Sequence, residues 1–552
     1  MKRQTTKLIF FIVVLSLSIQ VHAYDCIVDG LCYNLGSDTS TAAVTSAGGR
    51  YSGAIVIPES IIYNGGKYVV TEIGELAFDG CSGLTSVTIP NTVTEIGDGA
   101  FYGCSSLSLL VVGSGNPKYD SRGNCNAIIE TATNKLINGC KNTTIPNTVT
   151  EIGEFAFSYC GLTSVTIPSS VTTIGESAFN GCSGLATVTI PSSVTTIGSS
   201  AFNGCSGLTT VTIPSSVTTI GESAFCSCSG LTSVTIPNTV TTIGESAFLG
   251  CSGLTSVAIP NSVTTIGDWA FYDCSGLTSV TIPKSVTTIG NVAFSGCSSL
   301  TQLVVESGNP KYDSRGNCNA IIEKATKKLI RGCKTTTIPN SVKEIGEEAF
   351  SRCSGMATVA IPNSVTTIDK SAFYGCSDLT SVVIPKSVTT IGELSFWGCI
   401  GLKTITIPNS VKEIGEGAFY GCVGLTSAEI PNSVTELSKG TFYGCSGMTS
   451  VTIPSSVTTI GEGVFYRCHS LTTVTIPQSV TTIGESAFHG CRGLTEIICL
   501  ASNPPVCGIH AFKSIDQANC TLSVLPGSVS LYKEANQWKE FQQIRPHKQG
   551  RR

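Results

Sequence analysis

Hydrophobic residues recur along most of the chain at fixed places within a unit of 23 residues. In the unit formed by residues 182–204, Val188 and Ile190 alternate with threonines, which predicts a strand with one solvated face. Pro191 ends this strand, because proline cannot donate a hydrogen bond to a sheet. Gly198 then indicates a turn, and the following Ser-Ala-Phe segment is long enough only for a helical or 3-10 turn or a second short strand.

A phenylalanine marks this period, and a cysteine follows it three residues later in sixteen units. A single coil buries too few side chains to offset the entropy cost of ordering it, whereas stacked coils pair their strands and bury both faces of each coil. The period and the strand pattern therefore predict a mainly β leucine-rich repeat solenoid. The phenylalanines are Phe78, Phe101, Phe157, Phe179, Phe202, Phe225, Phe248, Phe271, Phe294, Phe350, Phe373, Phe396, Phe419, Phe442, Phe465 and Phe488.

The repeated phrase IPxSVTxIGxxAFxGCxxLTxV resembles the BspA-like, or treponemal-type, leucine-rich repeats of bacterial surface proteins, over about residues 70–500. The resemblance implies a parallel sheet on the concave side of the solenoid and short β, 3-10 or helical turns on its convex side. It also implies an adhesive role toward host proteins or other cells.

The ends of the chain differ from the repeats. Lys2, Arg3 and Lys7 precede an apolar run that is too short to span a bilayer, so residues 1–23 are predicted to be a secretory signal peptide. Residues 24–70 are predicted to form a β-rich N-terminal cap, because IIYNGGKYVV at residues 61–70 is typical of an Asn-Gly hairpin.

The repeat solenoid is expected over residues 71–500, and residues 501–552 are expected to form a C-terminal cap with a basic tail. The cap should contain a short helix around Val529 to Trp538. No apolar run after residue 23 is long enough to cross a membrane, so no transmembrane segment is expected after signal cleavage.

Two near-identical inserts interrupt the period, at about residues 108–141 and 302–334. In the first, residues 120–124 read as a turn and are followed by the strand-like segments 126–130 and 135–137. We interpret each insert as an oversized coil that carries a hairpin. A calcium site at the Asp/Asn turn is the alternative, although each insert has too few acidic residues to surround a hard cation.

Composition argues against several classes of protein. Charged residues make up 13% of the chain, the formal net charge is -4, and no Lys/Arg cluster stands outside the last residues, so a nucleic acid partner is not expected. His469, His489, His510 and His547 are not at metal-ligand spacing. We therefore expect no enzyme activity, no metal and no cofactor.

A recurring glutamate follows the glycine of the repeat. We expect this column in solvent, at the first turn of a short helical piece where the helix dipole favours a carboxylate. Its members are Glu176, Glu222, Glu245, Glu393, Glu416, Glu462 and Glu485.

The chain has 26 cysteines, which in a secreted protein would ordinarily predict disulfides. The sixteen repeat cysteines, from Cys81 to Cys491, would stack with Cβ atoms about 4.8 Å apart, which exceeds the roughly 3.5 to 4.5 Å of a disulfide. We therefore expect a column of buried free thiols. Candidate bridges elsewhere are Cys26 with Cys32, Cys125 with Cys140, Cys318 with Cys333, and pairs among Cys499, Cys507 and Cys520.

Hydroxyl side chains occupy the outward strand positions and would line the concave sheet as two polar rows. They suit a solvated β surface, and they are also a candidate recognition face, as concave solenoid surfaces commonly are. Ice binding is a third option, but Ala258, Val383 and Glu429 interrupt the rows. The candidate residues are Ser164, Thr166, Thr187, Thr189, Thr210, Thr212, Ser233, Thr235, Ser279, Thr281, Thr404, Thr406, Ser450, Thr452, Thr473 and Thr475.

A second candidate surface is an aromatic stripe, since the residue after phenylalanine is aromatic in five consecutive coils. Stacking within the turn explains such a column, and if exposed it is also a candidate protein or glycan platform. The stripe consists of Tyr374, Trp397, Tyr420, Tyr443 and Tyr466.

These observations predict a noncatalytic, monomeric protein of the bacterial surface or medium that adheres to other proteins through an extended surface. Glycan binding by the aromatic stripe is the first alternative, and a purely structural spacer is the second.

Overall fold

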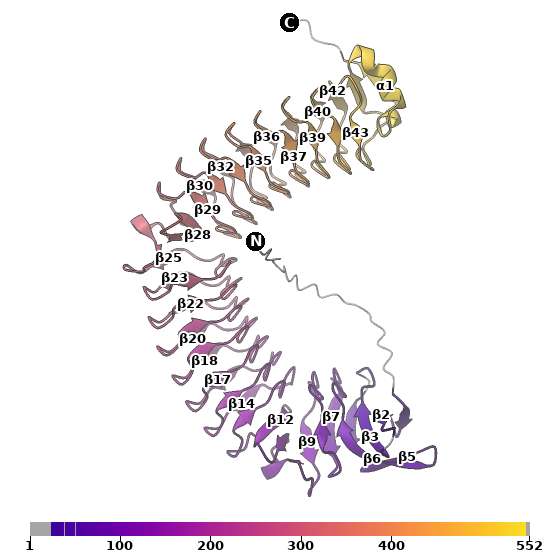
Figure 1. Cartoon of the computed structure of the whole chain (residues 1–552), viewed down its shortest axis with the longest axis vertical. Coiled ribbons are helices and arrows are strands. Elements are labelled where there is room, and N and C mark those ends of the chain that lie inside the picture. The colour runs from indigo at the N-terminus through magenta and orange to yellow at the C-terminus, as the bar shows by residue number, and fades with distance from the viewer. Residues whose placement is uncertain (1–23, 38, 50, 548–552) are drawn as a thin grey trace. The chain divides into compact units, whose positions relative to one another are not determined.

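The computed structural model describes residues 24–37, 39–49 and 51–547 (Figure 1). The predicted signal peptide, residues 1–23, and the last five residues of the basic tail lie outside this part. The chain forms two compact units, and the first contains residues up to Thr143 together with Ser158–Gly161. The second contains Thr144–Phe157 and the chain from Leu162 onward. Nearly all regular structure in both units is β-strand. The predicted division into caps and repeats near residues 70 and 500 stays a prediction.

The first unit begins with a sheet in the order β1-β2-β3-β6-β5, with β8 also paired to β6. β5 and β6 form the antiparallel hairpin predicted around Asn64 and Gly65. A second sheet, β4-β7-β9, is parallel, so the repeat pattern begins with β7. The strands are β1 Cys26–Val28, β2 Leu31–Leu35, β3 Thr41–Thr45, β4 Gly53–Val56, β5 Ser60–Tyr63, β6 Gly66–Ile73, β7 Leu84–Ile89, β8 Glu95–Ile96 and β9 Leu109–Val112.

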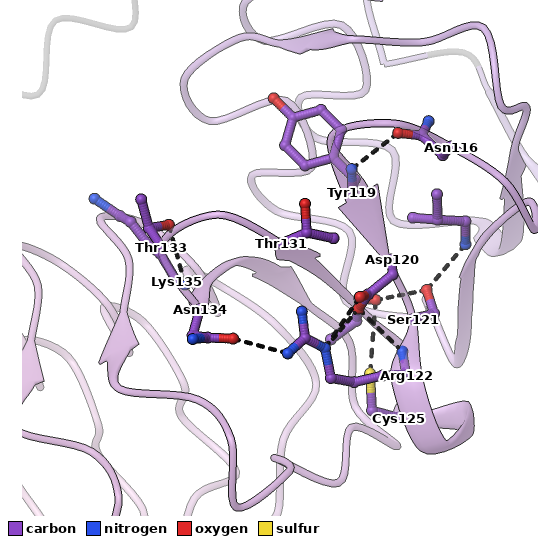
Figure 2. A network of polar contacts seen from close by, with 12 residues as sticks. Asn116, Tyr119, Asp120, Ser121, Arg122, Cys125, Thr131, Thr133, Asn134 and Lys135 are labelled. Atoms are coloured by element: carbon purple, nitrogen blue, oxygen red, sulfur yellow. Dashed lines mark hydrogen bonds and ion pairs between the residues drawn. The ribbon is translucent and has the colours of Figure 1, made fainter.

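The first insert is the hairpin that its sequence predicts. β10 (Tyr119–Asp120) pairs antiparallel with β11 (Ala127–Glu130), which pairs antiparallel with β12 (Lys135–Gly139). The 3-10 turn η1 (Arg122–Asn124) joins β10 to β11. Figure 2 shows the Arg122 side chain directed between Asp120 and Asn134, with its Nε donating to the Asp120 carboxylate at 2.9 Å.

The second unit contains a main ladder of short parallel strands in which equivalent residues of successive coils pair, for example Thr187 with Thr210. The side chain between the two outward positions is buried, as the alternating pattern predicts. The strands are β14 Ser164–Thr166, β16 Thr187–Thr189, β18 Thr210–Thr212, β20 Ser233–Thr235, β23 Ser279–Ile282, β25 Gln302–Val305, β30 Thr358–Ala360, β32 Ser381–Val383, β34 Thr404–Thr406, β36 Ser427–Glu429, β38 Ser450–Thr452, β40 Thr473–Ile476, β42 Glu496–Cys499, β44 Thr521–Val524 and β45 Gln543–Pro546.

A second ladder of two-residue strands follows the turn after each main strand. A second short strand was one of the options for the Ser-Ala-Phe segment after Gly198, but the strand lies before Gly198, where Thr-Ile pairs bond in parallel to their equivalents, as Thr196 does to Thr173. The strands are β13 Glu151–Ile152, β15 Thr173–Ile174, β17 Thr196–Ile197, β19 Thr219–Ile220, β21 Thr242–Ile243, β22 Thr265–Ile266, β24 Thr288–Ile289, β29 Glu344–Ile345, β31 Thr367–Ile368, β33 Thr390–Ile391, β35 Glu413–Ile414, β37 Glu436–Leu437, β39 Thr459–Ile460, β41 Thr482–Ile483 and β43 Val506–Cys507.

The second insert repeats the hairpin of the first, with β26 (Tyr312–Asp313), η2 (Arg315–Asn317), β27 (Ala320–Glu323) and β28 (Lys328–Gly332). β28 also pairs in parallel with β29, so the insert is built into the second ladder. After the last main strands, η3 (Pro526–Ser528), α1 (Val529–Glu534) and η4 (Trp538–Glu540) close the unit. The predicted helix is thus shorter than expected, and Trp538 begins a separate 3-10 turn.

In the core of the second unit, the repeat phenylalanines form two runs of stacked rings. In the second unit the ring centroids of neighbours from Phe157 to Phe294, and again from Phe350 to Phe512, lie 5.1 to 5.8 Å apart. The second insert separates the two runs. There, a Cβ on Gly332 would lie 2.2 Å from the Phe350 ring, so only glycine allows this packing.

The repeat cysteines are buried, as predicted, and the structure gives them a bonding role that the sequence did not reveal. Most of these thiols donate to the carbonyl of the phenylalanine in the preceding coil, as Cys205 does to Phe179 at 3.2 Å and Cys491 to Phe465 at 3.0 Å. Cys81 and Cys353 donate instead to the carbonyls of Asp79 and Gly332. All 26 cysteines lie in the described residues, and all are free. The candidate bridges are therefore not formed. Cys26 and Cys32, for instance, pair with Tyr33 and Ile27 across a hairpin and not with each other.

Gly198 begins a turn, as expected, since its carbonyl accepts the Ala201 N–H at 3.3 Å, but one further expectation about this turn is wrong. Gly198 is required by a close approach between coils, because a Cβ there would lie 2.6 Å from the backbone of Gly175. The glutamates after the repeat glycine are exposed, as expected, but they stand in turns and not in a helical piece. Burial and the neighbouring carboxylates of Glu222 and Asp268 raise the pKa of Glu245, so like charges repel along this column.

Removing one ring from the phenylalanine stack should destabilise the protein locally. Phe225 is fully buried, and its centroid lies 5.4 Å from that of Phe202 and 5.5 Å from that of Phe248. We expect Phe225→Ala to cost about 3 to 5 kcal/mol and to speed amide hydrogen exchange in the flanking coils only. Exchange measured by mass spectrometry tests this, with the exposed Thr212→Ala as control. A uniform increase along the unit would contradict nearest-neighbour stabilisation.

The thiol column should make the fold sensitive to alkali. Burial raises the pKa of Cys205 from 9.0 to about 12 and the pKa of Cys228 well above 9.0. The folded chain thus holds protons that the unfolded chain loses above pH 9, so this stability is complete below pH 9 and falls toward pH 12.

Each such thiol should contribute about 1.4 kcal/mol per pH unit to the slope of unfolding free energy in that window. Urea unfolding between pH 8 and 11 with a non-thiol reductant measures this slope. The variant Cys205→Ser/Cys228→Ser/Cys251→Ser keeps the hydrogen-bond donors but does not titrate, so its slope should be shallower by about three protons. Equal slopes for the variant and the parent would refute this role of the thiols.

Candidate functional site

The main ladder presents pairs of exposed hydroxyls on both sides of a buried aliphatic residue. Thr187 and Thr189 flank Val188 on β16, and the same arrangement recurs on β18, β20, β34, β38 and β40. Parallel pairing places a hydroxyl residue of one coil beside the equivalent hydroxyl residue of the next, as for Thr210 with Ser233 and Thr212 with Thr235. All sixteen residues of the predicted rows are exposed except Ser279, which is half-buried.

These strand hydroxyls differ from other hydroxyls of the repeat in having no bonding partner. In the described residues, no hydrogen bond reaches the side chains of the predicted rows, such as those of Thr187 and Thr189. By contrast, the Thr209 hydroxyl donates to the Ala186 carbonyl at 3.3 Å, and the Thr232 hydroxyl to the Thr209 carbonyl at 3.1 Å. The rows therefore keep both donor and acceptor capacity for a partner.

The rows are interrupted at Ala258, Val383 and Glu429, as the sequence indicates, and also at Val304 and Ala360. The coil with Ala258 forms only an isolated bridge between Ser256 and Ser279 in place of a strand. Val383 is 75% exposed and Glu429 is exposed, and both line an open groove of about 1390 Å³ at the ends of β32, β34 and β36. Lys386 and Thr406 also line this groove. The face is shallow and mostly uncharged apart from these positions.

The five residues of the aromatic stripe lie together and stack on one another. Ring centroids are 4.3 Å apart for Tyr374 and Trp397, 4.3 Å for Tyr420 and Tyr443, and 4.4 Å for Tyr443 and Tyr466. The step from Trp397 to Tyr420 is longer, at 5.9 Å. All five side chains are half-buried. The ring faces are therefore covered by neighbouring rings, and the edges and hydroxyls are what a partner can reach.

The stripe also extends to residues that the sequence analysis missed. His489 continues it, with its ring centroid 4.7 Å from that of Tyr466. Tyr272 stands at the equivalent position in an earlier coil, with the Arg352 guanidinium 5.9 Å from its ring centre. Aligning the residue after each repeat phenylalanine would have found both. Burial and the neighbouring Tyr420 raise the pKa of Tyr443 to about 12, so its phenol is a neutral donor at physiological pH.

The titratable groups of the described residues are spread along the repeats or engaged in pairs. Among the described residues, no three His, Cys, Asp or Glu side chains come close enough together to hold a metal ion. The repeat thiols have raised pKa values, as at Cys422, where burial raises it to about 12, whereas a nucleophilic cysteine needs a lowered one. In the inserts, Asp120 and Asp313 pair with Arg122 and Arg315 at 2.9 and 2.7 Å, so their carboxylates are already engaged.

Comparison with known proteins shows the same repeat. The family described as "BspA type Leucine rich repeat region (6 copies)" matches residues 60–122, 128–252, 218–326, 320–449, 368–495 and 412–523. No curated protein matches the chain. Across the part of the chain that the structure describes, no helix has the length and apolar character to cross a membrane.

Several solved structures are similar. The chain is 30% identical to a leucine rich cell surface protein from Faecalibacterium prausnitzii, with 77% of this chain and 93% of that chain covered and a TM-score of 0.44. It is 29% identical to a leucine-rich repeat protein from Eubacterium ventriosum, over 51% of this chain and 83% of that chain, with a TM-score of 0.43. For a leucine-rich repeat protein from Bacteroides ovatus the identity is 26%, the coverage is 95% and 100%, and the TM-score is 0.34.

The family match spans nearly all of residues 60–523, and the stacked parallel strands have the period that the match requires. The chain therefore belongs to the BspA-type leucine-rich repeat family.

Proposed function

We propose that this chain is a noncatalytic, monomeric protein of the bacterial cell surface or medium that adheres to host proteins or other cells. The observation that carries the proposal is the pair of exposed hydroxyl rows on the main ladder, whose side chains have no internal hydrogen bond. The strands do not need these side-chain hydroxyls for their own hydrogen bonds. An extended, shallow protein contact, by contrast, uses many polar groups of this kind. Membership of a leucine-rich repeat family of bacterial surface proteins supports an interaction role.

Glycan binding by the aromatic stripe is the second candidate, and the half-exposure of the rings favours it. Sugars usually pack on the face of an aromatic ring. In this stripe the faces are covered by stacking, for example at 4.3 Å between Tyr420 and Tyr443. The geometry therefore supports protein contacts through ring edges and hydroxyls better than it supports sugar stacking.

Carboxylates introduced into the hydroxyl rows should abolish protein binding without unfolding the chain. Glu429 already occupies a row position, so the variant Thr189→Glu/Thr235→Glu/Thr475→Glu should fold. We expect binding to immobilised extracellular-matrix proteins to fall by about tenfold or more, because charge repulsion and desolvation oppose the contact. Pull-down and biolayer interferometry measure it.

The matched control places the same charges on the second ladder of the same coils. The variant Thr196→Glu/Thr242→Glu/Thr482→Glu is tolerable there, because β35 and β37 naturally begin with Glu413 and Glu436. It should bind like the parent. Hits on a glycan array that Trp397→Ala abolishes would favour the glycan alternative, and an absence of binding in both assays would favour a structural spacer.

The proposed location has its own test. If the protein is displayed on the surface, protease treatment of intact producing cells should remove it from the cell fraction. If it is secreted, it should be found in the medium before treatment. A cytoplasmic marker protein should stay intact in the same sample. If an active protease leaves the chain of intact cells at full length, and the chain is recovered only after lysis, surface display and secretion are both ruled out.

A further inference from the structure

The last repeat coils of the second unit carry several basic residues at turn positions that are neutral or acidic in most other coils. The position after phenylalanine, aromatic from Tyr374 to Tyr466, becomes His489 and then Lys513. The next position, glycine in the preceding four coils, becomes Arg467. We name the resulting cluster the basic patch, and it consists of Arg467, His469, His489, Arg492, His510 and Lys513.

Backbone pairing between coils brings these residues side by side. The Arg467 N–H donates to the His489 carbonyl at 2.8 Å, and the Gly490 N–H donates to the Lys513 carbonyl at 2.8 Å. The His469 ring nitrogen Nδ1 lies 2.8 Å from the Gly490 carbonyl oxygen. All members of the patch are exposed except His489, which is half-buried.

The positive charge of the patch is not neutralised by the chain itself. Among the described residues, ion pairs engage Arg352, Lys370 and Lys439 at related turn positions, but none engages a member of the patch. Burial and the positive charges of Lys513, His510, Arg467 and Arg492 lower the pKa of His489, as expected in an uncompensated positive field.

Few carboxylates stand at repeat positions close to the basic patch. Glu462 is paired with Lys439 at 2.8 Å, and Asp516 accepts a hydrogen bond from the Asn519 side chain at 2.8 Å. Glu485 keeps the usual glutamate position, but in the next coil this position is Ile509. The glutamate column therefore ends at Glu485, within the coils that carry the basic patch.

Two features suit the patch to a polypeptide. The Arg467 guanidinium lies 5.3 Å from the centre of the Tyr466 ring, so it is held in place before a partner arrives. Ile509 is 62% exposed beside the charges and offers an aliphatic contact. An acidic peptide can supply both carboxylates and an apolar side chain, whereas a sulfated polysaccharide has no aliphatic side chain for Ile509.

We propose that the basic patch docks an acidic, extended segment of a partner protein, whose carboxylates meet Arg467, Arg492 and Lys513 and whose apolar side chain packs on Ile509. Arg467 and Lys513 are two coils apart, or about 10 Å at about 4.8 Å per coil. In an extended peptide of the polyproline II type, side chains three residues apart lie on the same face and about 9 Å from each other. Acidic residues three apart in the partner therefore match the spacing. The inference rests on the proposed protein-binding role but uses a surface distinct from the hydroxyl rows.

Synthetic peptides test the proposal directly on the full chain. The probe is a fluorescein-labelled peptide with glutamate at every third position and leucine between, and its binding is measured by fluorescence anisotropy. We expect saturable binding that weakens with added salt. The variant Arg467→Glu/Arg492→Glu/Lys513→Glu should weaken it by about tenfold or more. Ile509→Ser should weaken binding of this peptide but not of a counterpart with serine in place of leucine.

The matched control is Lys284→Glu/Lys343→Glu/Lys412→Glu, which makes the same change in net charge at exposed lysines and should bind like the parent. Equal loss in this control would show only a general charge effect and overturn the proposal. So would tighter binding of heparin that Ile509→Ser leaves unchanged, since that outcome identifies a polysaccharide site. If matrix-protein binding persists while the peptide fails to bind, this inference falls and the proposed function stands.

Discussion

Successive coils of the second unit are joined backbone to backbone at a fixed register, and no coil completes its own hydrogen bonds. A main strand such as β16 has its partners in the coils before and after it, and in the second ladder Thr173–Ile174 likewise pairs on both sides. Because a buried N–H or C=O without a partner is costly, each coil depends on its neighbours for folding. Every position that faces a neighbour must therefore carry the same kind of residue from coil to coil.

The interior shows how strongly this constraint acts. Within each run the phenylalanine rings pack on their equivalents, and in most coils the phenylalanine carbonyl accepts a hydrogen bond from the thiol of the next coil, as the Phe179 carbonyl does from Cys205. A cysteine here is small enough for the turn and still donates a weak hydrogen bond to a buried acceptor. This explains why so many cysteines can remain free thiols: their hydrogen-bonding role requires the reduced form.

The sequence predicted the features that follow from period and alternation: the main strands, the buried phenylalanines and cysteines, and the hairpins of the inserts. It did not predict the second ladder, because a two-residue strand such as Thr196–Ile197 shows no alternation to detect. Nor could it reveal the bonding of Cys205 or the reason for Gly198, since both depend on atoms of the preceding coil. For the candidate surfaces, exposure of the rows was predictable, whereas the sequence left open whether the stripe is stacked or exposed, and ring contacts such as the 4.3 Å between Tyr420 and Tyr443 show the stacking.

The basic patch is another feature that the linear sequence did not reveal. In the linear sequence Arg467, Arg492 and Lys513 are separated by more than twenty residues each, so they form no cluster, and the sequence predicted none. Stacking at one coil per repeat brings residues at the same and at adjacent repeat positions close together, which converts this dispersed set into one charged surface. In a solenoid whose inward positions are fixed by the ladder, selection can act freely only on outward positions. Binding specificity therefore depends on outward residues that differ from the repeat, as the residues of the basic patch do in the terminal coils.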